Sequence, residues 1–230
     1  MEKLTRNQVI KLSKTTGYIS GYDLSGLNLS MLDLIAIQFK GCNLKSANLS
    51  SSNLSMSNFD NTDLSNCNMS SSNFIGGSFR KANIENSDLT FSSFIGADFT
   101  EANLKGVNFT NSKISTANFE KADLTGANLQ MTEAVLIRMA NANLRNVSAY
   151  GSSMIGADFS GADMKGAMLH GTDLNGANLS SADLREASLL ETVLIAANLT
   201  NADLRNIKQR SVEMTRAKLD STKFDNEAKS

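Results

Sequence analysis

Ala97-Asp98-Phe99-Thr100-Glu101 and, further along, Ala177-Asn178-Leu179-Ser180-Ser181 are two copies of the unit that decides the fold. Each copy has a small residue, then Asn or Asp, then a large apolar residue that we call central, then two residues that are mostly polar or small. The central residue recurs at every fifth position from Leu24 to Phe224 without an insertion or deletion. Of these 41 positions, 38 hold Leu, Phe, Ile or Met, and the exceptions are Ala134, Ala149 and Gln209.

A period of five matches neither an α-helix, which repeats at 3.6 residues, nor a long strand, which alternates at two. It fits a short strand followed by a corner. Alternate side chains of a strand share a face, so the small and the central residue both point inward, and the Asn or Asp between them points outward. The last two residues turn the chain, and Asn, Asp, Ser and Gly favour such turns. The pattern predicts a solenoid of stacked coils.

The phenylalanines indicate the length of one coil. Phe39, Phe59, Phe79, Phe99 and Phe119 recur every twenty residues, which favours four repeats per coil over three. The coil then has four faces, numbered here by their first central residues: face 1 by Leu24, face 2 by Leu29, face 3 by Leu34 and face 4 by Phe39.

This sequence resembles the pentapeptide-repeat family, whose A-(D/N)-L-x-x consensus matches about nine-tenths of the chain. The resemblance implies an all-β fold, a right-handed quadrilateral β-helix of about ten four-repeat coils. We expect residues 1–17 to form a cap helix, residues 18–225 the solenoid, and residues 226–230 a polar tail. A capping box at Thr5 to Gln8 predicts where the helix begins.

The C-terminal end carries no cap helix that the sequence reveals, and Gln209 interrupts the core there. The last coil is therefore either covered by a second copy, end to end, as a homodimer, or frayed. The resemblance implies that family members often dimerise through their C-terminal ends, usually with an added helix that this chain lacks. A second irregular stretch is 131–150, where Ala134 and Ala149 underfill central positions and Ile137 and Val147 enlarge the small ones. Compensation of volumes within a regular coil is one interpretation; a kink that marks a binding spot is the other.

The composition excludes several classes of protein. The chain has no apolar run long enough to span a membrane and no secretory signal at its start, so we expect a cytoplasmic protein. Its 22 basic and 23 acidic residues give a net charge of −1, which argues against a nucleic-acid partner.

Candidate catalytic and metal-binding residues are few. His170 is the only histidine, and it is expected at the surface, while Cys42 and Cys67 occupy small inward positions. Neither a Walker phosphate loop nor a calcium-binding repeat is present. We therefore predict no catalytic site, no metal and no cofactor.

The position just after each central residue points outward, and two columns of such residues are candidate contact surfaces. Aliphatic residues concentrate on face 3, at Ile35, Ile75, Ile95, Val135, Ile155 and Ile195. This stripe is either a protein-binding surface or cross-strand packing of β-branched residues that suit exposed strands. A basic ladder lies on face 1, at Lys105, Arg145, Lys165, Arg185 and Arg205. Nearby Asp163, Asp183 and Asp203 suggest that this ladder is neutralised locally.

Two functions are compatible with these features. The first is a non-catalytic scaffold that presents a flat solenoid face to a protein partner, because solenoids commonly offer extended binding surfaces. The second follows from the family resemblance: a DNA-mimicking protein that binds type II topoisomerases such as gyrase and protects them against quinolones or peptide toxins. The neutral charge and the absence of long insertions argue against the second.

Overall fold

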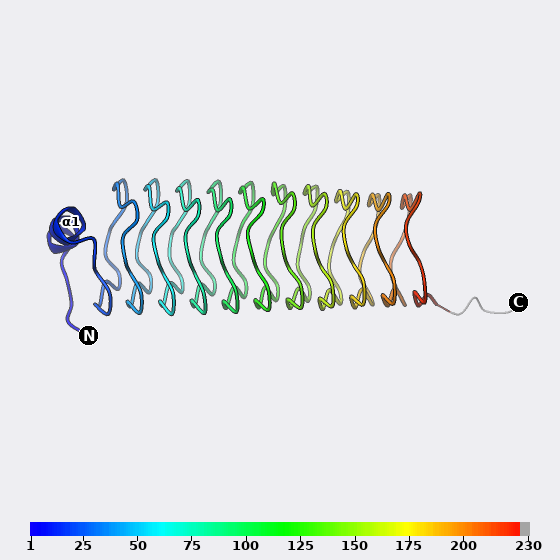
Figure 1. Cartoon of the computed structure of the whole chain (residues 1–230), viewed down its shortest axis with the longest axis horizontal. Helices are drawn as coiled ribbons and strands as arrows, with labels where there is room; N and C mark the ends of the chain where they lie inside the picture. The colour runs from blue at the N-terminus through cyan, green and yellow to red at the C-terminus, as the bar shows by residue number, and fades with distance from the viewer. Residues whose placement is uncertain (226–230) are drawn as a thin grey trace, which may run out of the picture.

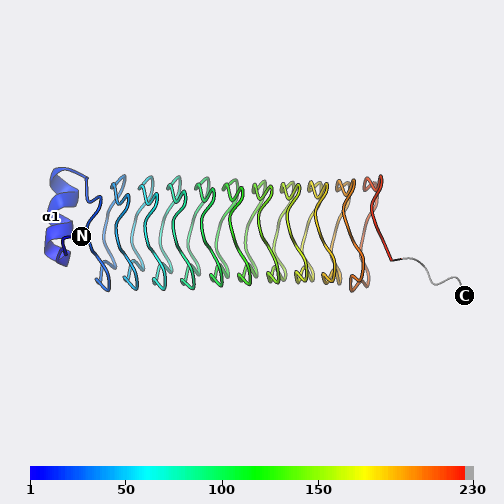
Figure 2. The same ribbon diagram turned by 90° about the horizontal axis from the view of Figure 1, so that it is seen from below.

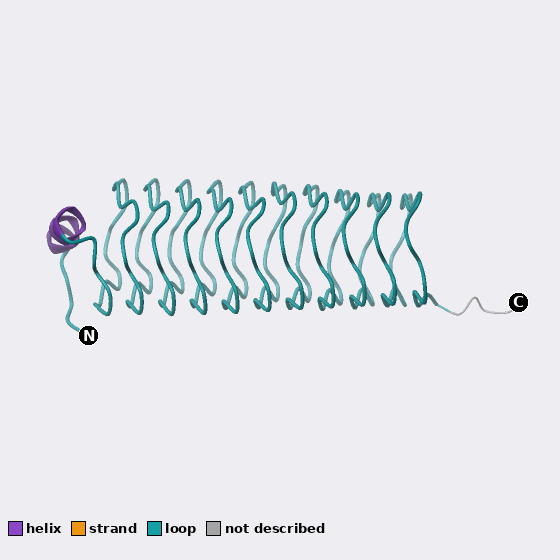
Figure 3. Cartoon of the chain, in the orientation of Figure 1, coloured by secondary structure: helices purple, strands orange, loops and turns teal. Residues whose placement is uncertain are grey.

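The computed structural model describes residues 1–225, and the predicted polar tail at 226–230 lies outside these residues. The chain forms one straight rod with α1 at one end (Figures 1 and 2). Beyond α1 there is no long strand in the described part, and the coils are drawn as loop throughout (Figure 3). Each side of a coil is so short that one residue per side pairs with each neighbouring coil.

The helix α1 spans Arg6–Thr15. The Thr5 hydroxyl accepts from the backbone N–H of Gln8, and the Gln8 side chain accepts from the backbone N–H of Thr5, at 2.8 Å. The helix packs Val9 onto the core, where it is fully buried. Arg6 also donates to the carbonyl oxygen of Ser30 in the first coil at 3.0 Å, so the helix is attached to the solenoid by apolar and polar contacts.

Parallel bridges join residues that are twenty apart on every face, from Tyr18 with Gln38 to Asp203 with Lys223. One turn of the solenoid therefore contains four repeats. From Leu24 to Leu204, the backbone N–H of each central residue donates to the coil that follows, as Leu24 does to the carbonyl of Asn43 at 2.7 Å. Nearly every backbone group of a coil is satisfied by its two neighbours, which is what a short extended segment needs in order to be buried.

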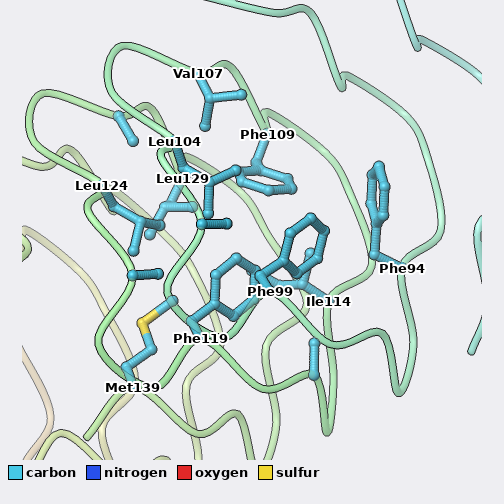
Figure 4. Packing of buried hydrophobic residues seen from close by; sticks show 14 of the residues in the cluster. Phe94, Phe99, Leu104, Val107, Phe109, Ile114, Phe119, Leu124, Leu129 and Met139 are labelled. Carbon is cyan, nitrogen blue, oxygen red and sulfur yellow. The ribbon is translucent and has the colours of Figure 1, made fainter. Parts of the chain in front are cut away.

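Central residues fill the interior, as the sequence predicts. Phe59, Phe79 and Phe99 are completely buried, and their rings stack with centroids 4.9 and 4.7 Å apart. The stack continues to Phe119, whose ring lies 4.6 Å from that of Phe99 (Figure 4). The prediction that the phenylalanines point inward in a ladder is confirmed.

Two sets of polar side chains complete the repeat. The Asn or Asp before a central residue accepts from the backbone N–H two residues on, as Asp63 does from Ser65 at 3.0 Å. Inward Ser and Thr side chains donate to the carbonyl of a central residue in the preceding coil; Ser57, for example, bonds Leu34 at 2.8 Å. Both contacts satisfy groups that a solenoid would otherwise bury without a partner.

The irregular stretch 131–150 follows the same path as the rest. Its bridges keep the twenty-residue step, and Ala134, Ile137, Val147 and Ala149 are all buried. The compensation interpretation therefore fits, and the kink is wrong: the rod stays straight (Figure 1). Within residues 1–225, no helix is long and apolar enough to cross a membrane.

Candidate protein-interaction surface

The aliphatic stripe of face 3 reaches the surface along most of the rod. Ile35, Ile75 and Ile155 are 40 to 46% exposed. The other three members, Ile95, Val135 and Ile195, are half-buried in the same column. Since the bridges place residues twenty apart in adjacent coils, these six side chains lie in one line parallel to the rod axis. Their role in binding stays a prediction.

Further apolar side chains border face 3 at its two corners, and the sequence analysis missed them. Met31, Phe91 and Met131 lie at the corner between faces 2 and 3, and Met56 and Leu136 lie at the corner between faces 3 and 4. All five are at least half exposed. The corners on either side of face 1 hold no large apolar residue at the same repeat position. The signal was present in the sequence, in the last position of the repeat.

These corner positions are unfavourable for such residues. The last residue of each repeat adopts a positive φ, and Phe91 has φ 57° and Leu136 φ 55°. Left-handed backbone costs a residue with a Cβ about 1–2 kcal/mol relative to the usual conformations, while Gly and Asn bear it best. A large exposed apolar side chain at this position therefore contributes neither to the core nor to the backbone. We call the five residues, together with the stripe, the face 3 surface.

Face 3 carries little charge in its middle coils. One residue stands just before each central position of this face. In the coils from Asn53 to Ser153, the charged residues at this position are Lys113 and Glu133. Their side chains pair with each other at 3.8 Å, and both are more than half exposed. Low charge combined with exposed apolar side chains is typical of the core of a protein interface.

A shallow polar groove runs beside this surface. It has a volume of about 400 Å³ and is lined by Phe91, by Lys113 and by Ser and Asn residues of four successive coils. The hydroxyl of Ser93 lies in the wall of the groove. It is one of two buried side-chain oxygen atoms in the described residues without a hydrogen-bond partner, the other being Oδ1 of Asn175.

His170 lies on face 2, as expected, beside a second groove of about 470 Å³ that Tyr150, Met168 and Leu190 also line. Its ring meets that of Tyr150 edge-on at 5.2 Å, and its Nε2 lies 3.2 Å from a carboxylate oxygen of Glu191. In residues 1–225, no three His, Cys, Asp or Glu side chains come together in a way that could hold a metal ion.

The two cysteines are buried, as predicted. The thiol of Cys67 donates to the carbonyl of Leu44 at 3.0 Å, and that of Cys42 to Ile19 at 2.7 Å. Burial raises the pKa of both thiols, that of Cys67 to about 12. The reactive species is the thiolate, so neither cysteine is suited to act as a nucleophile.

The basic ladder is neutralised along its length. All five residues form ion pairs with a carboxylate at 2.5 to 3.3 Å. Arg205 pairs with Asp203 and holds the pKa of that carboxyl at about 2. The charges on face 1 thus satisfy one another, and the ladder has no excess of positive charge to attract a polyanion.

Comparisons with known proteins agree with this geometry. A profile described as pentapeptide repeats matches eight copies between residues 20 and 208. The search of curated proteins finds no significant match. Among solved structures, the chain is similar to HetL, a pentapeptide repeat protein involved in heterocyst differentiation regulation from the cyanobacterium Nostoc sp. strain PCC 7120. The identity is 21%, with 96% of this chain and 94% of that chain covered and a TM-score of 0.54.

A second similar structure is QnrB1, a plasmid-mediated fluoroquinolone resistance protein. Its identity is 23%, the alignment covers 76% of this chain and 91% of that chain, and the TM-score is 0.46. At these identities the solved structures show the fold alone. HetL is a right-handed quadrilateral β-helix, the fold that the family resemblance implies.

Proposed function

Because this chain belongs to the pentapeptide-repeat family, we propose that it is a non-catalytic scaffold that binds protein through its face 3 surface. One observation carries the proposal: every large apolar residue at a left-handed corner borders this one face. If these residues served only to turn the chain, they would be expected at all four corners, and Gly or Asn would serve better. The cytoplasmic location expected from the sequence stays a prediction.

Cross-strand packing, the alternative explanation of the stripe, accounts for only part of it. β-branched residues do stabilise neighbouring strands when they lie in register. The stripe, however, is broken by Ser55, Ser115 and Asn175, and the corner residues are neither β-branched nor placed within a strand. A contact surface explains both groups of residues, whereas strand packing explains one.

The test replaces Ile75, Ile95 and Ile155 together with Asp. Two of these side chains are about 40% exposed and the third is half-buried at the same outward position, so the solenoid should still fold. The matched control carries Asp at Ser160, Ser180 and Thr200, which hold the same repeat position on face 4. Wild type and control are expected to capture the same proteins in affinity purification with quantitative mass spectrometry, and the face 3 variant is expected to lose them. Identical capture by all three proteins would exclude this surface.

Binding to a topoisomerase through DNA mimicry is the alternative. Mimicry of duplex DNA needs a strongly negative surface, whereas here the net charge is −1 and four Asp residues of face 1 are paired with Arg or Lys, namely Asp123, Asp163, Asp183 and Asp203. The assay is gyrase supercoiling with and without a quinolone. We expect no effect at micromolar protein, and protection at that concentration would favour the alternative.

The homodimer through the last coil also stays a prediction. Leu219 and Phe224 hold central positions there, yet each is about 40% exposed, because within the described residues no further coil covers them. The N–H groups that would pair with a next coil, such as those of Met214 and Leu219, donate to no backbone carbonyl of the described residues. An exposed strand edge of this kind favours pairing with another chain. Leu219→Asp should abolish such a contact.

A further inference from the structure

One point in the middle of face 3 relates two pairs of glycines at the corner after this face, and one pair of the aliphatic stripe. Take as centre the point between the coil that contains Lys113 and the coil that contains Glu133. At the corner after face 3, the two nearest coils on either side then hold Thr116 and Leu136. The next pair is Gly96 and Gly156, and the pair after that is Gly76 and Gly176, all four with positive φ. The same centre relates Ile95 to Ile155 in the aliphatic stripe.

We propose that a second copy of this chain occupies face 3, antiparallel to the first, with a twofold axis through that centre. This inference rests on the proposed function, since it names the occupant of the same surface. A twofold axis that lies in the interface, perpendicular to both rods, reverses the order of the coils but leaves each column facing the same column. The spacing of about 4.8 Å between coils is identical in both copies, so every coil meets one coil of the partner.

Charge selects this register. With the axis between the two coils, Lys113 of each copy faces Glu133 of the other, and the surface is self-complementary. A shift of the axis to either coil would place Lys113 against Lys113, or Glu133 against Glu133. A parallel dimer would instead place each charged residue against the uncharged stripe, with Glu133 facing Val135. Both residues are more than half exposed in the single rod, so each can exchange its partner within the chain for one across the contact.

Shape is complementary in the same register. At the corner after face 3, Gly96 faces Gly156 and Gly76 faces Gly176. Because these residues have no side chain, the backbones of the two rods can approach closely there. At the other corner Phe91, which is 66% exposed, faces Gly151. A Cβ at Gly151 would lie 2.8 Å from the sulfur of Met131 in its own chain, so this sulfur lies beside the position that the Phe91 ring would take. Sulfur and aromatic rings attract each other.

Polar residues near the axis also find partners. Ser93 faces Ser153 of the second copy, so two uncharged polar side chains meet there. Asn73 faces Asp173, an amide against a carboxylate. In the eight coils nearest the axis, no two like charges face each other. The first like pair is Asp33 with Glu213, at the far ends of the rods, where the coils can remain in water.

The contact would be of modest size. Eight coils span about 38 Å along the rod, and a face from one corner to the other is about 10–15 Å wide. This strip is smaller than the roughly 800 Å² per partner of a standard interface. We therefore expect a dimer with a micromolar dissociation constant.

Charge reversal tests the arrangement by sedimentation equilibrium. Lys113→Glu alone, or Glu133→Lys alone, is expected to weaken dimerisation at least tenfold, and the double variant should return to within threefold of wild type. The matched control is the pair Lys81 and Glu101, which bond at 3.5 Å at the corner between faces 4 and 1. Lys81→Glu should leave dimerisation unchanged. A double variant as weak as either single variant would overturn the register.

Small-angle scattering and crosslinking test the geometry. The maximum dimension of the antiparallel dimer should stay close to that of one rod, whereas contact through the last coil would nearly double it and overturn the inference. Ile95→Cys with Ile155→Cys should crosslink two chains through a short bismaleimide, and Ile35→Cys with Ile155→Cys, which lies three coils or about 14 Å out of register, should not. A strict monomer at 200 μM, with partner capture still abolished by the triple Asp variant, would refute the dimer while the scaffold function stands.

Discussion

Replacing Phe79 with Leu tests how much the ring ladder contributes to the stability of the rod. Phe79 is completely buried and touches four other rings. It stacks on Phe59 and Phe99 at 4.9 and 4.7 Å, and meets Phe74 and Phe94 nearly edge-on at 5.7 and 5.9 Å. Leu keeps most of the buried apolar volume and removes all four ring contacts.

Phe159 provides the matched control. It occupies the same column of face 4 and is equally buried, but no other ring lies against it in the described residues, and its column neighbours are Met139 and Leu179. Phe→Leu at either site loses a similar amount of apolar surface, so that cost cancels in the comparison. Four ring pairs at the lower limit of about 0.5 kcal/mol each make the substitution at Phe79 about 2 kcal/mol more costly.

The assay is unfolding in urea, monitored by circular dichroism. The free energy of unfolding is calculated for both variants with the same dependence on urea concentration. Each coil contacts only its neighbours, so the loss should also appear as faster hydrogen exchange in the coils around Phe79. If the two variants lose the same free energy to within about 0.5 kcal/mol, stacking adds nothing beyond burial and the reasoning about the ladder is refuted.

Three further predictions concern the corner, the thiols and one ion pair. Phe91→Asn should raise the free energy of unfolding by about 0.5–1 kcal/mol, because Asn tolerates the left-handed backbone, and should weaken protein contact through face 3; a loss of stability in thermal melts would contradict this. Since the pKa of Cys67 is about 12 and that of Cys42 is also raised, neither thiol should react with a thiol reagent at pH 8 until urea unfolds the chain, and rapid labelling of the folded protein would contradict it. The pKa of Asp203 is about 2 in the folded chain, against about 3.9 in an unfolded chain. The ion pair with Arg205 therefore stabilises the fold above about pH 4, and this stabilisation is lost as the pH falls through 2. At this exposed site it amounts to less than about 1 kcal/mol. Arg205→Ala should raise that pKa in an NMR titration, and an unchanged value would show that Arg205 is not its cause.

Much of this structure could be predicted because the repeat leaves few alternatives. An apolar residue at every fifth position, held for forty steps, fixes which side chains point inward, and the spacing of Phe39, Phe59 and Phe79 identifies the twenty-residue coil. The neutral surface of face 1 was also visible, because Asp163, Asp183 and Asp203 stand close to basic residues of the ladder. Asp183 and Asp203 pair with the basic residue two positions on, whereas Asp163 pairs with Arg145 of the preceding coil.

The remaining features depend on contacts that the repeat does not encode. The hydrogen bond of the inward Ser57 to Leu34 crosses between coils and follows only from their stacking. The apolar corners were missed because the last repeat position was interpreted as a turn, where side-chain size was given no meaning. The positive φ of Phe91 and Leu136 shows why size matters there. The irregular residues at 131–150 left two interpretations open, because only the structure shows that Ala134 and Ile137 are both buried while the coil keeps its twenty-residue step.

The twenty-residue coil underlies every assignment of a residue to a face, and pyrene fluorescence measures it directly. Pyrene labels on Thr100→Cys and Glu120→Cys should lie on adjacent coils of face 4, about 4.8 Å apart, and give strong excimer emission. Labels on Thr100→Cys and Ser115→Cys should lie on different faces and give none. Cys42 and Cys67 are buried and should remain unlabelled. Excimer emission from the second pair and not the first would mean three repeats per coil, and the face 3 surface would not exist.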